Sequence, residues 1–122
     1  MLAKISKLKT FFDPFESPSP WHSVTHRANR MLTTRLIRQA IKKRHFHESP
    51  SYGESLEDRI ARIAYFVEYG WEDPIHVRIR HANCMILDGN HRYAAAIYRR
   101  DKTIDCEVSG DLQNCSLLIG ME

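Results

Sequence analysis

The sequence predicts an α+β fold with a small mixed β-sheet and packed helices. Three observations lead to this prediction. Residues 75–80 and 103–108 alternate apolar and polar side chains, as half-buried strands do. The apolar run 84–87 suits a short buried strand between them. Helical patterns precede and follow this region, so the order from residue 55 is helix, strand, strand, helix, strand.

The helix expected from residue 55 has a clear start and a clear end. Ser55 is followed three residues later by Asp58, as in a capping box. Gly70 stands where a helix C-terminal cap belongs. Apolar residues recur between them at helical spacing, at Leu56, Ile60, Ile63 and Val67. Short connections then predict that the next two strands pair as a hairpin.

The domain boundary is expected near residue 53. Residues 1–52 are interpreted as a basic N-terminal helical arm with a linker, and residues 53–122 as the α+β domain. Residues 1–12 predict a short amphipathic helix, and the proline-rich segment 13–21 predicts a linker or an extended wrap. Residues 117–119 are expected to form a last edge strand or a packed tail.

The arm carries most of the positive charge. Residues 1–47 hold ten Lys and Arg against two Asp and Glu, a net charge of +8 (10 − 2), whereas the rest of the chain holds eight against thirteen, a net charge of −5 (8 − 13). A helix is predicted over 24–44, capped by Ser23 or Thr25. Its basic face is interpreted as solvated, as docked on an acidic partner or on the chain's own second half, or as a nucleic-acid contact. The cations in question are Arg27, Arg30, Arg35, Arg38, Lys42, Lys43 and Arg44.

Composition excludes several classes of protein. Cys84, Cys106 and Cys115 show no C-x-x-C spacing, so neither a zinc ribbon nor a thioredoxin-type site is expected. Their number is odd, a disulfide framework is not expected, and the chain is interpreted as cytoplasmic. No apolar run reaches 18 residues, and the N-terminus lacks a continuous apolar segment, so neither a membrane span nor a signal peptide is expected.

The turn that follows residue 87 is the main candidate for a functional site. A strand, the break Asp88-Gly89 and a helix point backbone N–H groups at an anion, because the first N–H groups of a helix have no internal partner. Gly89 permits a sharp turn and a close ligand. His91 and Arg92 could add donors, and Arg92 is the stronger phosphate candidate because its planar fork matches phosphate oxygens.

These motifs resemble the ParB/sulfiredoxin superfamily. The resemblance covers about residues 54–108: a helix ending at Gly70, the sequence Asp-Pro-Ile-His-Val at 73–77, and Asp-Gly-Asn-His-Arg at 88–92. The family implies a nucleotide-phosphate pocket, with CTP, ATP or ADP and Mg²⁺ as ligands. Carried over, it places phosphates on the backbone of Gly89 and Asn90 and on the side chains of His91 and Arg92.

Residues that differ from the family's motifs limit the reactions that this chain could catalyse. Asn90 stands where sulfiredoxin has its nucleophilic cysteine, so sulfinic-acid reduction is not expected. The turn is one residue from the Asp-Gly-His-His-Arg of the superfamily's free-serine kinases, which keeps a phosphotransferase or an NTP hydrolase open, with Asp88 and His91 as candidate catalytic residues. A second phosphate motif and a helix-turn-helix, as in partition ParB proteins, are not expected.

Three functions therefore stay open. The leading hypothesis is a nucleotide- or phosphate-binding ParB-like domain. The first alternative is a nucleic-acid-binding protein or a ParB-like nuclease, contacting DNA or RNA through Arg92 and the basic helix. The second is a catalytically inactive protein-interaction module. Turn geometry and helix capping explain Gly89 and Asp88 as well as a ligand does.

Overall fold

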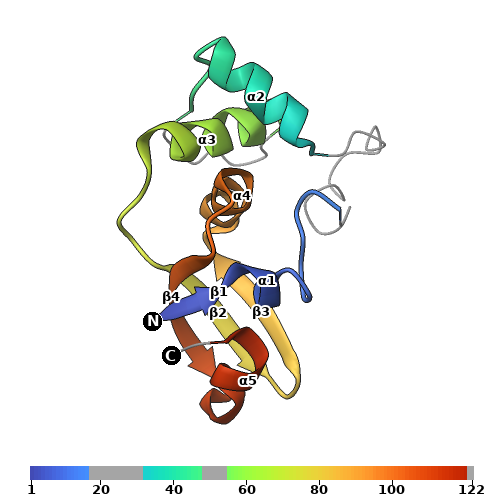
Figure 1. Ribbon diagram of the computed structural model, residues 1–122, viewed down its shortest axis with the longest axis vertical. Helices are drawn as coiled ribbons and strands as arrows, with labels where there is room; N and C mark the ends of the chain where they lie inside the picture. The colour runs from blue at the N-terminus through green and yellow to red at the C-terminus, as the bar shows by residue number, and fades with distance from the viewer. Residues whose placement is uncertain (17–31, 48–54, 121–122) are drawn as a thin grey trace. The chain divides into compact units, whose positions relative to one another are not determined.

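The chain divides into two compact units in its computed structural model, which describes residues 1–16, 32–47 and 55–120 (Figure 1). The first, here called the sheet unit, comprises Met1–Asp13 and Trp71–Glu122. The second, the helical unit, comprises Pro14–Gly70. This division differs from the boundary expected near residue 53. The first thirteen residues belong with the C-terminal half, and the helix that follows Ser55 belongs with the helical unit.

A four-stranded mixed sheet forms the sheet unit. Its strands are β1 (Leu2–Lys4), β2 (Ile75–Arg80), β3 (Asn83–Asp88) and β4 (Thr103–Gly110), in the spatial order β1-β4-β2-β3. β2 and β3 form the predicted antiparallel hairpin, β2 pairs in parallel with β4, and β1 pairs antiparallel with β4. The α+β class with a small mixed sheet is therefore confirmed.

Helices cover one face of this sheet. They are α1 (Ile5–Leu8), α4 (Asn90–Arg99) and α5 (Cys115–Ile119), and the 3₁₀ turn η1 (Leu112–Asn114) leads from β4 into α5. Figure 1 shows α1 and α5 in front of the strands. β2 alternates buried and exposed side chains along its whole length, because only one face meets the core. The buried core consists of Ala3, Ile5, Leu8, Ile75, Val77, Ile79, Cys84, Tyr93, Ala96, Ile104, Cys106, Cys115 and Ile119.

The N-terminal segment differs from the amphipathic helix expected over residues 1–12. Leu2–Lys4 is an edge strand, and α1 is only four residues long. The pairing of Leu2 with Asp105 and of Lys4 with Thr103 supplies strand hydrogen bonds that the local pattern does not encode. At the other end, residues 117–119 belong to α5, so the tail packs as a helix and not as an edge strand.

The helical unit contains α2 (Thr34–Lys42) and α3 (Leu56–Tyr69), which pack on each other. α3 confirms the predicted signals: the Ser55 hydroxyl accepts from the Asp58 N–H at 3.1 Å, and Gly70, at φ 76°, ends the helix. α2 is shorter than the helix expected over 24–44, and its cap is Thr33. Ser23 and Thr25, proposed as caps, lie outside the described residues. No helix in the described part of the chain is long and apolar enough to cross a membrane.

One partly buried hydrogen bond joins the N-terminal segment to α4. The Tyr93 hydroxyl donates to the Phe12 carbonyl at 2.7 Å, and the side chain of Tyr93 is fully buried. We expect Tyr93→Phe to lower the free energy of unfolding by about 1 kcal/mol, because the carbonyl loses its partner while the ring still fills the core. Urea unfolding followed by fluorescence measures this, and an unchanged midpoint would contradict the role of the bond.

The same residue predicts a pH dependence. Burial raises the pKa of Tyr93, and the nearby Asp13 carboxylate raises it further. The neutral phenol is therefore favoured in the folded state. Its contribution to stability is complete below the ordinary tyrosine pKa, about 10, and is lost as pH rises above it. We expect the alkaline loss of stability to be shallower in Tyr93→Phe than in wild type when unfolding is measured between pH 9 and 11.

Candidate functional site

The turn at the start of α4 is shaped by a glycine that packing requires. Asp88 ends β3, Gly89 caps the helix with φ 102°, and Asn90 begins α4. A side chain at Gly89 would be strained at this φ and would overlap Cγ2 and Cβ of Ile75. The core strand β2 therefore accounts for the glycine without a ligand.

Arg92 is engaged within the protein. Its Nη1 donates to the carbonyl oxygens of Asp73 at 2.9 Å and of Pro74 at 3.1 Å, and its Nη2 lies 3.3 Å from Oδ2 of Asp88. The side chain is only 13% exposed. Arg92 thus fastens the segment that enters β2 to the start of α4. A cation at a helix start is electrostatically unfavourable by itself, and here Asp88 and two carbonyl oxygens offset that cost.

The two candidate catalytic residues, Asp88 and His91, both lie at this turn but in different environments. The Asp88 side chain is 72% exposed, and its carboxylate lies at the positive end of α4, where it stabilises the helix and repels another anion. His91 is partly buried and already has an interaction partner. Asn90 is partly buried as the first residue of α4. No side chain caps the first N–H groups of α4, so backbone donors remain at this turn.

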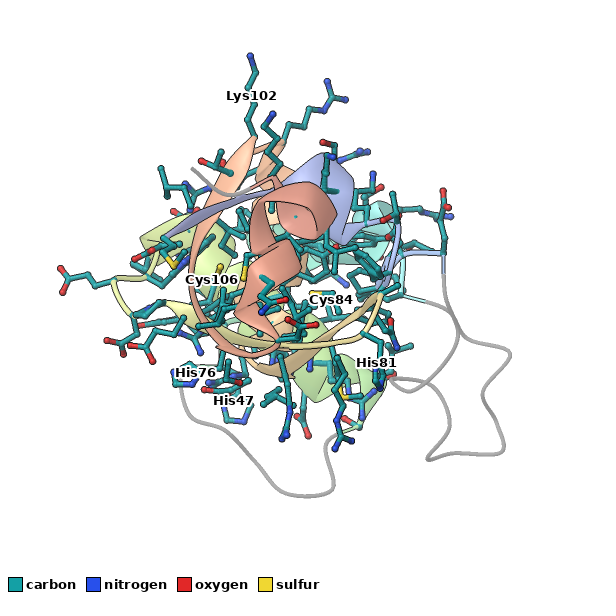
Figure 2. The ribbon with its side chains drawn as sticks, turned by 90° about the horizontal axis from the view of Figure 1, so that it is seen from below. His47, His76, His81, Cys84, Lys102 and Cys106 are labelled. Carbon is teal, nitrogen blue, oxygen red and sulfur yellow. The ribbon has the colours of Figure 1, made fainter. Side chains whose placement is uncertain are left out.

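The cysteines are unsuited to nucleophilic catalysis. All three are free thiols buried in the core, and Figure 2 places Cys84 and Cys106 in the interior, with His76 and His81 at the periphery. Burial raises the pKa of Cys84 and of Cys106 to about 11, so both stay protonated near neutral pH. Within residues 1–16, 32–47 and 55–120, no group of three or more His, Cys, Asp or Glu side chains could hold a metal ion.

A basic cavity lies elsewhere in the sheet unit, at the far end of α4. It has a volume of about 580 Å³. One wall comes from β1 and α1, with Lys4, Ile5 and Lys9, and the other from the turn between α4 and β4, with Arg100 and Lys102. The walls are joined where the Ile5 N–H donates to the Lys102 carbonyl at 2.9 Å. Figure 2 shows the Lys102 side chain extending outward from the ribbon.

Positive charge dominates this cavity. Lys9 lies 3.8 Å from Asp13, and the lining carboxylate of Asp101 lies 3.4 Å from Arg99. The remaining cations have no ion pair with any described residue: Lys4, Arg100 and Lys102. The negative end of the α4 dipole favours Arg100 and Lys102, which follow the C-terminus of that helix. It does not explain the lysines that the N-terminal segment contributes.

Sequence reasoning missed this cavity because its walls lie almost a hundred residues apart. The run Arg99–Lys102 is visible in the sequence, as are the N-terminal lysines. Only the antiparallel pairing of β1 with β4, in which Lys4 faces Thr103, brings them together. A strand predicted over residues 2–4 would have been the signal, and its three residues are too few to show a period.

The basic face expected in the arm is exposed where it is described. Arg44 is held within the helical unit, with Nη2 3.5 Å from the Tyr69 hydroxyl and the guanidinium 5.4 Å from the Phe46 ring centre. No ion pair to a described residue is present at the other four cations, which are Arg35, Arg38, Lys42 and Lys43. Arg27 and Arg30 lie outside the described residues.

No protein-family model, curated protein or solved structure matches the chain. The resemblance to the ParB/sulfiredoxin superfamily therefore stays a prediction that rests on the motifs at 70–77 and 88–92. The geometry offers two chemically distinct places for an anion: the turn at the start of α4, where backbone donors meet an exposed carboxylate, and the basic cavity at its end.

The contacts of Arg92 predict a structural role that can be measured. We expect Arg92→Ala to lower the free energy of unfolding by about 2 kcal/mol, because the hydrogen bonds of a charged, largely buried group are removed together. Arg92→Lys is the matched control: it keeps a charge near Asp88 but lacks the fork that reaches both carbonyls, so an intermediate loss is expected. Urea unfolding checks both, and wild-type stability in Arg92→Ala would contradict the structural role.

Proposed function

We propose that this chain binds a phosphate-bearing small molecule, with a nucleotide as the leading candidate, in the basic cavity between α1 and the α4–β4 turn. One observation carries the proposal. Lys4, Arg100 and Lys102 face a cavity of about 580 Å³ without an ion pair to any residue that the structure describes. Cations that converge without an internal counter-charge repel one another, and a bound phosphate relieves that repulsion.

The size and lining of the cavity support a nucleotide over a bare ion. Pockets for small molecules occupy about 300–1,000 Å³ and combine apolar walls with a few polar groups. Ile5 and Ile97 supply the apolar wall against which a base or a sugar ring would pack. The hydroxyls of Ser6 and Thr103 supply neutral hydrogen-bonding groups beside the cations. An arginine fork at position 100 suits a terminal phosphate.

The turn at 88–92 is the weaker of the two places. Its support is the family resemblance together with the uncapped N–H groups of α4. Against it stand the internal contacts of Arg92 and the exposed carboxylate of Asp88, which would repel a polyphosphate. Mg²⁺ would arrive with the phosphates, as it usually does, and Asp101 is the carboxylate in the cavity wall.

The proposal is for binding and does not include a reaction. The carboxylate of Asp101 lies 3.4 Å from Arg99. An ion-paired carboxylate of this kind suits a structural role better than that of a general acid or base. Phosphotransfer or NTP hydrolysis at Asp88 and His91 remains a separate hypothesis tied to the turn. The cytoplasmic setting assumed for a nucleotide ligand is compatible with three free, buried thiols.

Charge reversal at two exposed positions tests the site. We expect Arg100→Glu/Lys102→Glu to weaken ATP, CTP or ADP binding by at least about a hundred-fold, since each charged hydrogen bond contributes roughly 1.5–3 kcal/mol. Isothermal titration calorimetry and thermal shift measure this with and without Mg²⁺, with inorganic phosphate as a second probe. Lys42→Glu/Lys43→Glu on α2 is the control of equal charge change and should bind like wild type.

His91→Ala separates the two places for the ligand. It removes a side chain from the turn and leaves the basic cavity intact, so binding should persist. If His91→Ala lost binding while Arg100→Glu/Lys102→Glu kept it, the ligand would be assigned to the turn. Failure of wild type to bind any of the four probes would reject the proposed function.

A second candidate is contact with nucleic acid through α2. The helix contains no acidic residue, and its exposed cations form no ion pair with described residues, so the helix presents a basic face that suits a polyanion. We expect binding of labelled DNA to weaken log-linearly with salt. Arg35→Glu/Arg38→Glu should make the slope shallower by about 0.9 for each phosphate that the variant no longer neutralises. An unchanged slope would reject this face.

A further inference from the structure

The face of the sheet opposite the helices carries an exposed patch beside the β2–β3 hairpin. β2 presents Arg78 and Arg80 there, and β3 presents Met85 and Leu87. The two apolar side chains are 57% and 53% exposed. β3 is an edge strand of the sheet, so apolar side chains stand in water next to an unpaired strand edge, an arrangement that proteins usually avoid unless a partner covers it.

The two arginines have no internal counter-charge among the described residues. In the register of the sheet, Arg78 faces Met85 on one side and Ser109 on the other, and Arg80 faces Asn83. Neither arginine forms an ion pair with a described residue. The patch is therefore cationic.

Acidic groups near the patch are occupied elsewhere. Glu107 lies 3.4 Å from the imidazole of His76, at the opposite end of β2. Asp111 follows β4, and its carboxylate accepts from the Gln113 N–H at 3.2 Å. Asp88 lies at the far end of β3, beside Arg92. The positive charge of Arg78 and Arg80 is thus available to a binding partner.

A groove adjoins the arginines at the hairpin. It has a volume of about 490 Å³ and is lined by Phe11, His81, Asn83 and Met85 together with Arg78 and Arg80. It brings together a benzene ring, an imidazole and two guanidinium planes, with an amide and a thioether. Flat groups of this kind are what unpaired bases stack on, and an amide can hydrogen-bond a base edge.

His81 occupies an unusual position for its residue type. It begins the two-residue turn between β2 and β3 and has φ 56°, a region that glycine or asparagine adopts at lower cost. Figure 2 shows His81 at the edge of the sheet unit, with the buried Cys84 nearer the middle of the ribbon. His81 lines the groove from a backbone conformation that costs a histidine some free energy.

We propose that this patch binds single-stranded nucleic acid, with a base in the groove and backbone phosphates on Arg78 and Arg80. Side chains two residues apart on a strand are about 6.6 Å apart, which sets the arginines in a row along an extended backbone. The exposed apolar and planar groups suit unstacked bases, which a duplex does not present. An acidic peptide would satisfy the charges but would not use the ring-lined groove. This patch shares no residue with the basic cavity, so the proposal is independent of the proposed function.

Charge reversal on the patch tests the proposal against a matched control. Fluorescence anisotropy with labelled ten-nucleotide oligo-U and mixed-sequence single-stranded DNA measures affinity at 50 and 150 mM salt. We expect Arg78→Glu/Arg80→Glu to weaken binding at least about ten-fold. Arg35→Glu/Arg38→Glu, with the same change of charge on α2, is the comparison and should weaken binding less than the patch reversal does, because those arginines do not line the groove. Circular dichroism confirms that each variant is folded.

A second variant tests the groove without changing a full charge. His81→Gly removes the ring and suits φ 56°, so stability should hold or rise while affinity falls about five-fold, as expected when a stacking partner is removed. The proposal is overturned if wild type does not bind at 50 mM salt, or if the patch reversal has no effect. It is equally overturned if the α2 reversal alone abolishes binding, if a duplex of the same sequence binds as tightly, or if polyglutamate displaces the oligonucleotide equally well.

Discussion

The parallel pairing of β2 with β4 is the constraint on which the sheet unit depends. β2 is an interior strand whose Ile75, Val77 and Ile79 are essentially fully buried, and it pairs with β3 on one side and β4 on the other. Two parallel strands cannot be joined by a tight turn, so the chain must cross over between them. Here the crossover is β3 followed by α4, and it fixes where each end of α4 lies.

The start of α4 is consequently a crowded junction. Gly89 lies against Ile75, Arg92 holds the carbonyls of Asp73 and Pro74, and Tyr93 reaches the Phe12 carbonyl. Gly89 and the guanidinium of Arg92 therefore attach the helix to β2 and the segment before it, and the Tyr93 hydroxyl attaches it to the N-terminal segment. A motif typical of phosphate sites also serves, in this chain, to close the junction between strand and helix.

Much of the fold could be predicted because it is local. The hairpin of β2 and β3, the strand β4 and the caps at Ser55 and Gly70 follow from period, spacing and turn chemistry. The short N-terminal strand could not be predicted, because its conformation is set by pairing with β4 and not by its own residues. The basic cavity could not be predicted for the same reason, since one of its walls depends on that pairing. The role of Arg92 could not be read from its position, because its partners are backbone carbonyls about twenty residues upstream.

The topology also explains why cations collect in separate places on the sheet unit. Alternation along β2 sends Arg78 and Arg80 to the face that no helix covers, while the core takes their neighbours. Arg100 and Lys102 follow the C-terminal end of α4, whose dipole attracts cations, and they line the basic cavity together with the N-terminal lysines. These two groups face different environments: one borders a cavity with an apolar wall, and the other an open surface with exposed apolar side chains. A small anion with an attached ring suits the first, and an extended polyanion with unstacked bases suits the second, so the shape around each group of charges, and not the charge alone, distinguishes the ligands.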